Sequence, residues 1–264
     1  LFIAFTAVVV LLGVQKGIET VSKFMMPVLV LLSVGIALYG LTVDGAMEGL
    51  IYYLKPSFEN FSIKTVLAAM GQLFYSMSLA MGIMVTYGSY MKKDNNLESS
   101  VRQIEIFDTG IAFLAGLMII PGVFAFSGGT AESLNQGPGL MFVTLPKVFD
   151  SMPMGDVIGT LFFLLVFFAA LTSAISLMET IVSILRDKFH WKRKFTCGVV
   201  TIIALLMGLP SSLGFGMWSH IKFIGLSILD TFDFISNSVL MPILAFFTCI
   251  FVGFVIKPKT IADE

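Results

Sequence analysis

The chain has 264 residues, of which 57% are hydrophobic and 12% charged, with 16 basic residues against 17 acidic ones. A soluble globular domain carries about 25% charged residues, so this composition excludes a water-soluble globule, and its apolar content excludes intrinsic disorder. A net charge of -1 excludes a nucleic-acid binder, and two cysteines exclude a disulfide scaffold. The composition predicts an all-α, polytopic membrane protein, since the strict alternation of β-barrel strands is absent.

Seven apolar segments predict membrane-spanning helices, at roughly 1–14, 24–43, 66–90, 104–126, 157–185, 195–210 and 228–256. A span needs about 20 apolar residues, and tilt or a break lets a segment run longer or shorter. The loops and tail that follow the odd-numbered segments hold twelve Lys and Arg, and the other loops hold four. Because cytoplasmic loops are rich in these residues, the first set is predicted to lie in the cytoplasm.

The chain begins at Leu1, already within an apolar run, and this run lacks the basic lead-in of a signal peptide. We therefore expect residues 1–264 to form a single but incomplete transmembrane domain whose upstream helices are missing. Cys197 and Cys249 fall in predicted helices and are expected to be buried free thiols.

The third segment carries small and hydroxyl residues through its middle, from Gly71 to Gly82. Gly and Ser are poor helix formers, and a broken helix at membrane depth is tolerated where it lines a cavity. There it frees backbone groups for ligands. The alternative is an unbroken helix whose small residues allow close packing against a neighbour.

The fifth segment places Thr172, Ser176 and Glu179 on one helical face, with Ser173 beside them. Clustered hydroxyls near a free carbonyl suit a small hard cation, which prefers oxygen ligands. The alternative is that these hydroxyls bond back to carbonyls of their own helix.

Two acids lie within or beside apolar segments, Asp108 near the start of the fourth and Asp233 near the start of the seventh. Charged groups at membrane depth are functional candidates, although acids are also favoured at helix starts by the helix dipole. The catalytic motifs HExxH, GxSxG, paired CxxC and the phosphate loop are absent from the sequence, which gives no support to an enzyme.

Four stretches together resemble the neurotransmitter:sodium symporters of bacterial type. Gly71–Gly82 with Thr86–Tyr90 is similar to helix six, and Phe167–Ser173 is similar to the sodium-binding part of helix eight. Gly13–Glu19 and Met25–Pro27 resemble the junction of helices four and five, and Gly45–Leu50 with Tyr52–Pro56 resembles the third outer loop. The resemblance runs from the end of helix four through helix ten, and Ala80 stands where many members have Gly.

The resemblance implies part of an inverted repeat of five plus five helices, with helices one and six broken around a central site. Helices one to three and any after the tenth would be missing, and helix one would supply roughly half of both sodium sites. The implied ligands are Ser76 and Asp108 at a first sodium site, and the Ala169 carbonyl with the Thr172 and Ser173 hydroxyls at a second. The substrate would contact Tyr75, Ser76, Ser78, Met81, Ser173 and Leu177, and the outer gate would contain Gln72 and Asp233.

The implied function is sodium-coupled symport of a neutral or hydrophobic amino acid by alternating access, without covalent chemistry and therefore without enzyme activity. Asp108 would supply the charge that chloride supplies in other members, so no chloride and no cofactor is expected. The expected partners are the amino acid, sodium, the lipid bilayer and the missing helices, and the expected location is the bacterial inner membrane, multi-pass. The rival interpretations are a seven-helix receptor, another secondary transporter and a membrane-embedded enzyme.

Overall fold

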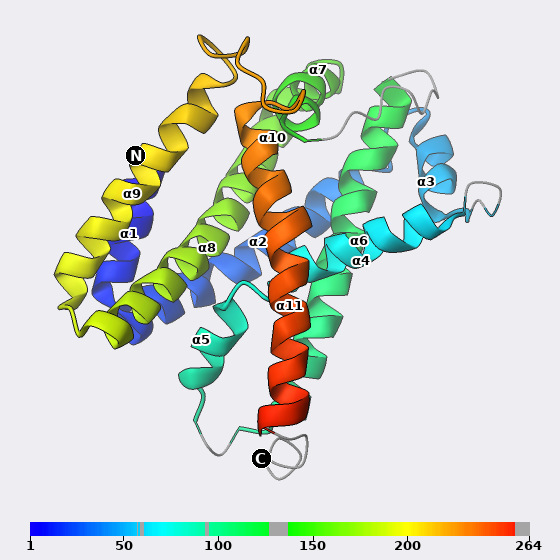
Figure 1. Cartoon of the computed structure of the whole chain (residues 1–264). Helices are drawn as coiled ribbons and strands as arrows, with labels where there is room; N and C mark the ends of the chain where they lie inside the picture. The colour runs from blue at the N-terminus through cyan, green and yellow to red at the C-terminus, as the bar shows by residue number, and fades with distance from the viewer. Residues whose placement is uncertain (57, 59–60, 93–94, 127–136, 257–264) are drawn as a thin grey trace. The chain divides into compact units, whose positions relative to one another are not determined.

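The computed structural model describes residues 1–56, 58, 61–92, 95–126 and 137–256. Their regular structure is helical, apart from one antiparallel bridge between Phe223 and Leu226 (Figure 1). The α-helices are α1 (Phe2–Leu12), α2 (Thr20–Gly40), α3 (Ala46–Leu54), α4 (Ile63–Ser76), α5 (Ile83–Ser89), α6 (Leu97–Phe126), α7 (Leu145–Asp150), α8 (Gly155–Phe189), α9 (Arg193–Leu213), α10 (Ile228–Asp233) and α11 (Met241–Ile250). Four π-helical stretches adjoin them: η1 (Val14–Glu19), η3 (Leu140–Thr144), η4 (Phe234–Leu240) and η5 (Phe251–Ile256).

Among the described residues, five helical stretches are long and apolar enough to cross a membrane: Gly17–Gly40, Leu97–Phe126, Gly155–Phe189, Arg193–Leu213 and Ile228–Ile256. The all-α, polytopic class is confirmed. Two predicted segments are not among these five stretches: the first forms the 11 residues of α1, and the third is divided between α4 and α5, as its predicted break implies. At 1.5 Å per residue, the 14-residue α4 covers about 21 Å, which is less than the hydrocarbon core.

The fourth span begins earlier than the apolar pattern predicts, at Leu97 in place of residue 104. The Asn96 side chain caps the helix, since its Oδ1 accepts a hydrogen bond from the Ser99 amide at 2.8 Å. The first turns of α6 are polar, so the hydropathy pattern does not predict them as part of the span, yet they are helical. Lys93, Lys257 and Lys259, which enter the charge count, lie outside the described residues.

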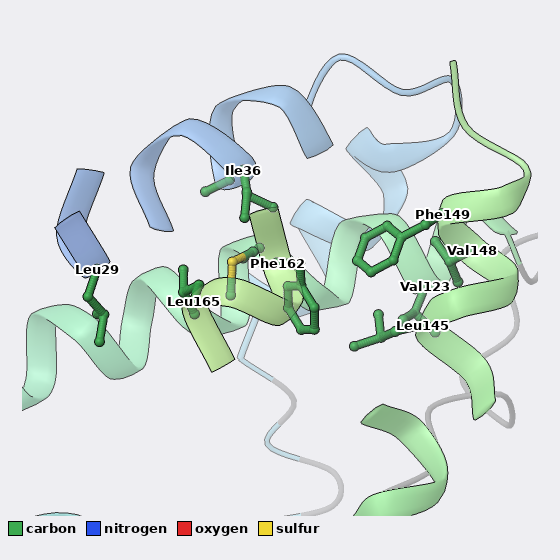
Figure 2. Packing of buried hydrophobic residues seen from close by; sticks show 10 residues of the cluster. Leu29, Ile36, Val123, Leu145, Val148, Phe149, Phe162 and Leu165 are labelled. Atoms are coloured by element: carbon green, nitrogen blue, oxygen red, sulfur yellow. The ribbon is translucent and has the colours of Figure 1, made fainter. Parts of the chain in front are cut away.

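The chain divides into two compact units, one made of Leu1–Ile18, Ser62–Glu105 and Ser173–Glu264, the other of Glu19–Phe61 and Ile106–Thr172. The second unit has an apolar core between α2, α6, α7 and α8, shown in Figure 2. Its rings include Phe149 and Phe162, whose centroids lie 5.2 Å apart. In the same unit α3 approaches α6 at Gly49, where an added Cβ would lie 2.6 Å from the Phe124 Cβ. A Cβ does not fit at this distance, so the close approach of the two helices requires glycine at position 49.

In the first unit, α1 lies beside α9 (Figure 1). Cys197 is buried there as expected, but Cys249 on α11 is exposed, so the prediction of a buried thiol is wrong for this residue. The reason is the exposure of most of the stretch Ile228–Ile256, since only 6% of its most apolar window is buried by the described protein. Apolar side chains in a membrane-spanning helix can face lipid, so an apolar sequence there does not imply burial in protein.

Candidate functional site

The helix break predicted in the third segment is confirmed. α4 ends at Ser76 and α5 begins at Ile83, so the chain between them is not helical. Three residues in this stretch have left-handed backbone conformations: Ser78 at φ 54°, Ala80 at φ 61° and Gly82 at φ 76°. For a residue with a Cβ this conformation is strained, and such strain concentrates at functional sites. Ala80 therefore adopts the conformation that glycine takes readily.

The break places polar groups in the middle of an apolar segment. The last turn of α4 closes with the Ser78 amide donating to the Tyr75 carbonyl at 3.1 Å and the Leu79 amide donating to the Phe74 carbonyl at 2.9 Å. α5 then restarts, with the Thr86 amide donating to the Gly82 carbonyl at 3.0 Å. Interrupted helices of this kind present backbone carbonyls and amides to a bound ion or substrate.

Five predicted site residues lie at this break or within a few residues of it. Gln72, Tyr75 and Ser76 lie on the last turns of α4, and Ser78 and Met81 lie in the non-helical stretch. The Tyr75 side chain is 52% exposed, so its ring is not committed to the core of the described chain. The Ser76 hydroxyl donates to the Leu73 carbonyl at 3.5 Å. Their roles in binding substrate and in gating stay predictions.

The second predicted cation site lies along one turn of α8. The Thr172 hydroxyl lies 3.2 Å from the Phe168 carbonyl oxygen and 3.0 Å from that of Ala169, so it bonds back to its own helix as the alternative interpretation proposed. The same geometry holds two predicted ligand oxygens, those of Thr172 and Ala169, next to each other. A hydroxyl that donates its single hydrogen retains two lone pairs, so the back-bond and ligation of a cation are compatible. Ser173 and Leu177 are exposed on α8.

Glu179 shares the helical face of Thr172, but its carboxylate is committed to an ion pair. Its side chain is fully buried, and both its oxygens bond to the Arg193 guanidinium, Oε1 at 3.1 Å from Nη1 and Oε2 with Nη2. The Tyr90 hydroxyl donates to Oε1 at 2.9 Å. Arg193 also donates from Nε to the Val10 carbonyl at 2.9 Å, which ties α1 to the start of α9.

Glu179 was a candidate from the sequence, but its partners Tyr90 and Arg193 were not, and neither was Tyr87, whose hydroxyl lies 3.0 Å from that of Ser176. One signal for the ion pair was available: a buried carboxylate in an apolar helix requires a cation, and basic residues follow α8 closely. The tyrosines had no such signal, because contacts across 89 residues of sequence follow from packing.

The two predicted acids differ from ordinary helix-start acids. α6 begins at Leu97, so the half-buried Asp108 lies about three turns into the helix. The Asp233 Oδ1 accepts a hydrogen bond from the Asn237 side-chain amide at 2.6 Å, and Asp230 occupies the first turn of α10. The helix-start interpretation is therefore wrong for Asp108 and describes Asp230 better than Asp233. The pairing of Ser76 with Asp108 around a sodium ion stays a prediction.

Comparison with known proteins identifies the chain's relatives. The model of the Sodium:neurotransmitter symporter family matches residues 1–264. The chain is 38% identical over 263 residues to an uncharacterized sodium-dependent transporter, YhdH, of Bacillus subtilis, matching 100% of this chain and 57% of that protein. It is 32% identical over 190 residues to the sodium- and chloride-dependent glycine transporter 1 of Xenopus laevis, matching 68% of this chain and 30% of the transporter.

A solved structure agrees with these relatives. The crystal structure of MhsT in complex with L-phenylalanine has a TM-score of 0.86 and 42% identity, covering 96% of this chain and 57% of MhsT. The chain thus spans 57% of the length of the Bacillus subtilis protein and of MhsT. The likeness confirms the all-α symporter fold that the helix-six and helix-eight motifs indicated, and a seven-helix receptor is the wrong interpretation. The chain belongs to the sodium:neurotransmitter symporter family.

Proposed function

We propose that this chain is the part of a sodium-coupled amino-acid symporter that runs from the end of helix four through helix ten. The full-length transporter is the longer protein that would contain it. The observation that carries the proposal is the broken helix between α4 and α5, with strained residues at Ser78 and Ala80 in mid-segment. A stable fold retains such a break where backbone groups are needed to hold a ligand.

The substrate in this proposal is a neutral or hydrophobic amino acid. Two relatives are associated with amino acids: MhsT was solved in complex with L-phenylalanine, and the Xenopus laevis relative is named a glycine transporter. Met81 and Leu177 would line the side-chain pocket and favour an apolar substrate, while Ser78 and Ser173 would add hydroxyls. Tyr75 would close over the substrate, and Gln72 and Asp233 would form the outer gate.

Sodium would bind at two places and drive transport. The Ser76 hydroxyl and the Asp108 carboxylate would ligate the first ion, and Ala169, Thr172 and Ser173 the second. Alternating access in the bacterial inner membrane would then use the sodium gradient and the membrane potential, worth about 2.3 kcal/mol per charge per 100 mV. Binding and a conformational change account for this activity without covalent chemistry, so neither enzyme activity nor a cofactor is part of the proposal.

The proposal predicts that residues 1–264 alone do not transport. Helix one would supply roughly half of both sodium sites, so without it each site has too few oxygen ligands to replace the hydration shell of the ion. Uptake of a panel of amino acids into proteoliposomes, driven by an inward sodium gradient, should be absent for residues 1–264 and present for the full-length transporter. Sodium-driven uptake by the shorter chain would contradict this prediction, and its absence from the full-length transporter would contradict the proposed function.

A second prediction concerns the ligands on α8. In the full-length transporter, Thr172→Val or Ser173→Ala should raise the sodium concentration for half-maximal uptake about tenfold, because loss of one hydrogen-bonded hydroxyl from a charged ligand is worth about 1.5–3 kcal/mol. The matched control is Thr160→Val, which removes an exposed hydroxyl bonded to the Asp156 carbonyl on the same helix. Sodium titrations that do not distinguish Thr172→Val from Thr160→Val would contradict the second sodium site.

A further inference from the structure

The short helix α5, which follows the break, is attached to α8 by two tyrosine hydroxyls. The Tyr87 hydroxyl lies 3.0 Å from that of Ser176, and either can donate the hydrogen bond. The Tyr90 hydroxyl donates to the Glu179 carboxylate at 2.9 Å. Tyr87 lies on α5 and Tyr90 is the residue that caps its end, while Ser176 and Glu179 lie on consecutive turns of α8. The two contacts hold the end of α5 against α8.

The start of α5 is also close to α8. Gly82, which caps α5, has a backbone φ of 76°, and an added Cβ there would lie 3.3 Å from the Thr180 Cγ2. Farther along the helix, the ion pair with Arg193 holds Glu179 in place. These contacts all lie within one compact unit of the chain. α5 therefore contacts α8 at both of its ends, and Tyr87 contacts it between them.

Ser176 connects this attachment to the predicted sodium ligands. It lies four residues after Thr172 on α8, one helical turn away on the same face. A serine hydroxyl on a helix can bond both to its own helix and to a neighbouring element, since it has one hydrogen and two lone pairs. The Ser176 hydroxyl contacts Tyr87, so the residue of α8 that meets α5 follows Thr172 by one helical turn.

We propose that Tyr87 and Ser176 are a positioning pair that couples sodium at the second site to the position of α5. The inference rests on the proposed function. Sodium held by Ala169, Thr172 and Ser173 would order this part of α8, and the Tyr87 contact would then hold α5 against the ordered turn. Release of sodium frees the turn, and α5 separates from it. Because coupling between two sites is reciprocal, loss of the Tyr87 contact must weaken sodium binding although neither hydroxyl touches the ion.

The test is a double-mutant cycle in the full-length transporter, read as the sodium dependence of amino-acid uptake in proteoliposomes at saturating substrate. Tyr87→Phe and Ser176→Ala should each raise the half-saturating sodium concentration about fivefold, the lower end of common allosteric couplings. The amount of reconstituted protein and the uptake rate at saturating sodium should stay at wild-type levels. The double variant should resemble either single variant, because both remove the same bond.

Two further variants separate this role from general destabilisation. Tyr53→Phe removes another tyrosine hydroxyl, one that donates to the Phe113 carbonyl at 3.4 Å in the other unit, and should leave the sodium dependence unchanged. Ser176→Thr keeps the hydroxyl and should retain wild-type sodium affinity. If Tyr87→Phe does not accumulate in the membrane, the comparison of Ser176→Ala with Ser176→Thr tests the inference alone.

Three outcomes overturn the inference while leaving the proposed function intact: unchanged sodium dependence in Tyr87→Phe and Ser176→Ala, additive effects in the double variant, or equal sodium affinities for Ser176→Ala and Ser176→Thr. Wild-type protein that takes up no amino acid in response to sodium overturns the proposed function itself. The two failures are thus distinguishable in a single experiment.

Discussion

Asp108→Asn in the full-length transporter should lower sodium-driven amino-acid uptake about a hundredfold. A sodium ion removed from water requires compensating negative charge, and the carboxylate of Asp108 is the group proposed to supply it at the first site. Removing one partner of a buried, hydrogen-bonded charge pair costs about 2–5 kcal/mol, and every 1.4 kcal/mol is tenfold in affinity. Asparagine has nearly the same size as aspartate and keeps one side-chain oxygen. The expected loss of uptake therefore measures the effect of removing the negative charge.

The same uptake measurements, made with and without chloride, test whether Asp108 supplies the compensating charge. If Asp108 supplies the charge, wild-type uptake should be the same in chloride and in gluconate, and added chloride should partly restore uptake by Asp108→Asn. Asp156→Asn is the matched control, because it neutralises an exposed acid in the first turn of α8 and should leave uptake near the wild-type level. Wild-type uptake that collapses in gluconate would show that Asp108 is not the compensating charge.

Arg193→Met should produce the largest loss of stability among the described ion pairs. It leaves the fully buried Glu179 carboxylate without its cation and removes the guanidinium hydrogen bonds to the Val10 carbonyl. Breaking a buried pair by removing one partner typically costs about 3–5 kcal/mol, since a charge then stays in an apolar surrounding. The unfolding temperature of the purified full-length transporter in detergent should fall well below that of the wild type, and the folded yield should fall with it.

Two matched variants identify the cause of this loss. Lys23→Met breaks the exposed pair of Lys23 with Glu19, which joins neighbouring turns at 2.9 Å, and exposed pairs of this kind contribute about 0.3–0.5 kcal/mol. Glu179→Met combined with Arg193→Met removes both charges and should recover much of the stability, because apolar residues often replace a buried pair without loss. Equal unfolding temperatures for Arg193→Met and Lys23→Met would contradict a stabilising role for the buried pair.

Some helix boundaries could be predicted from the sequence and others could not. The break in the third segment was predictable because Gly and Ser between Gly71 and Gly82 disfavour a helix, and the structure interrupts the helix from Met77 to Gly82. The start of α6 was not predictable from hydropathy, because the Asn96 cap begins the helix in polar sequence, before the apolar segment. That extension is also why Asp108 lies inside a helix and not at its start.

The class of the protein, the approximate positions of its apolar helices and the break could all be predicted, because they follow from local composition and from the exclusion of unpaired polar groups from hydrocarbon. The family motifs are also local stretches of sequence. Which groups meet could not be predicted: Glu179 contacts Arg193 and Tyr90, Ser176 contacts Tyr87, and Arg193 contacts the Val10 carbonyl 183 positions away. The spacing of residues along a helix predicts which side chains share a face, but the partner of that face is selected by how helices pack, and packing depends on side chains from distant segments together.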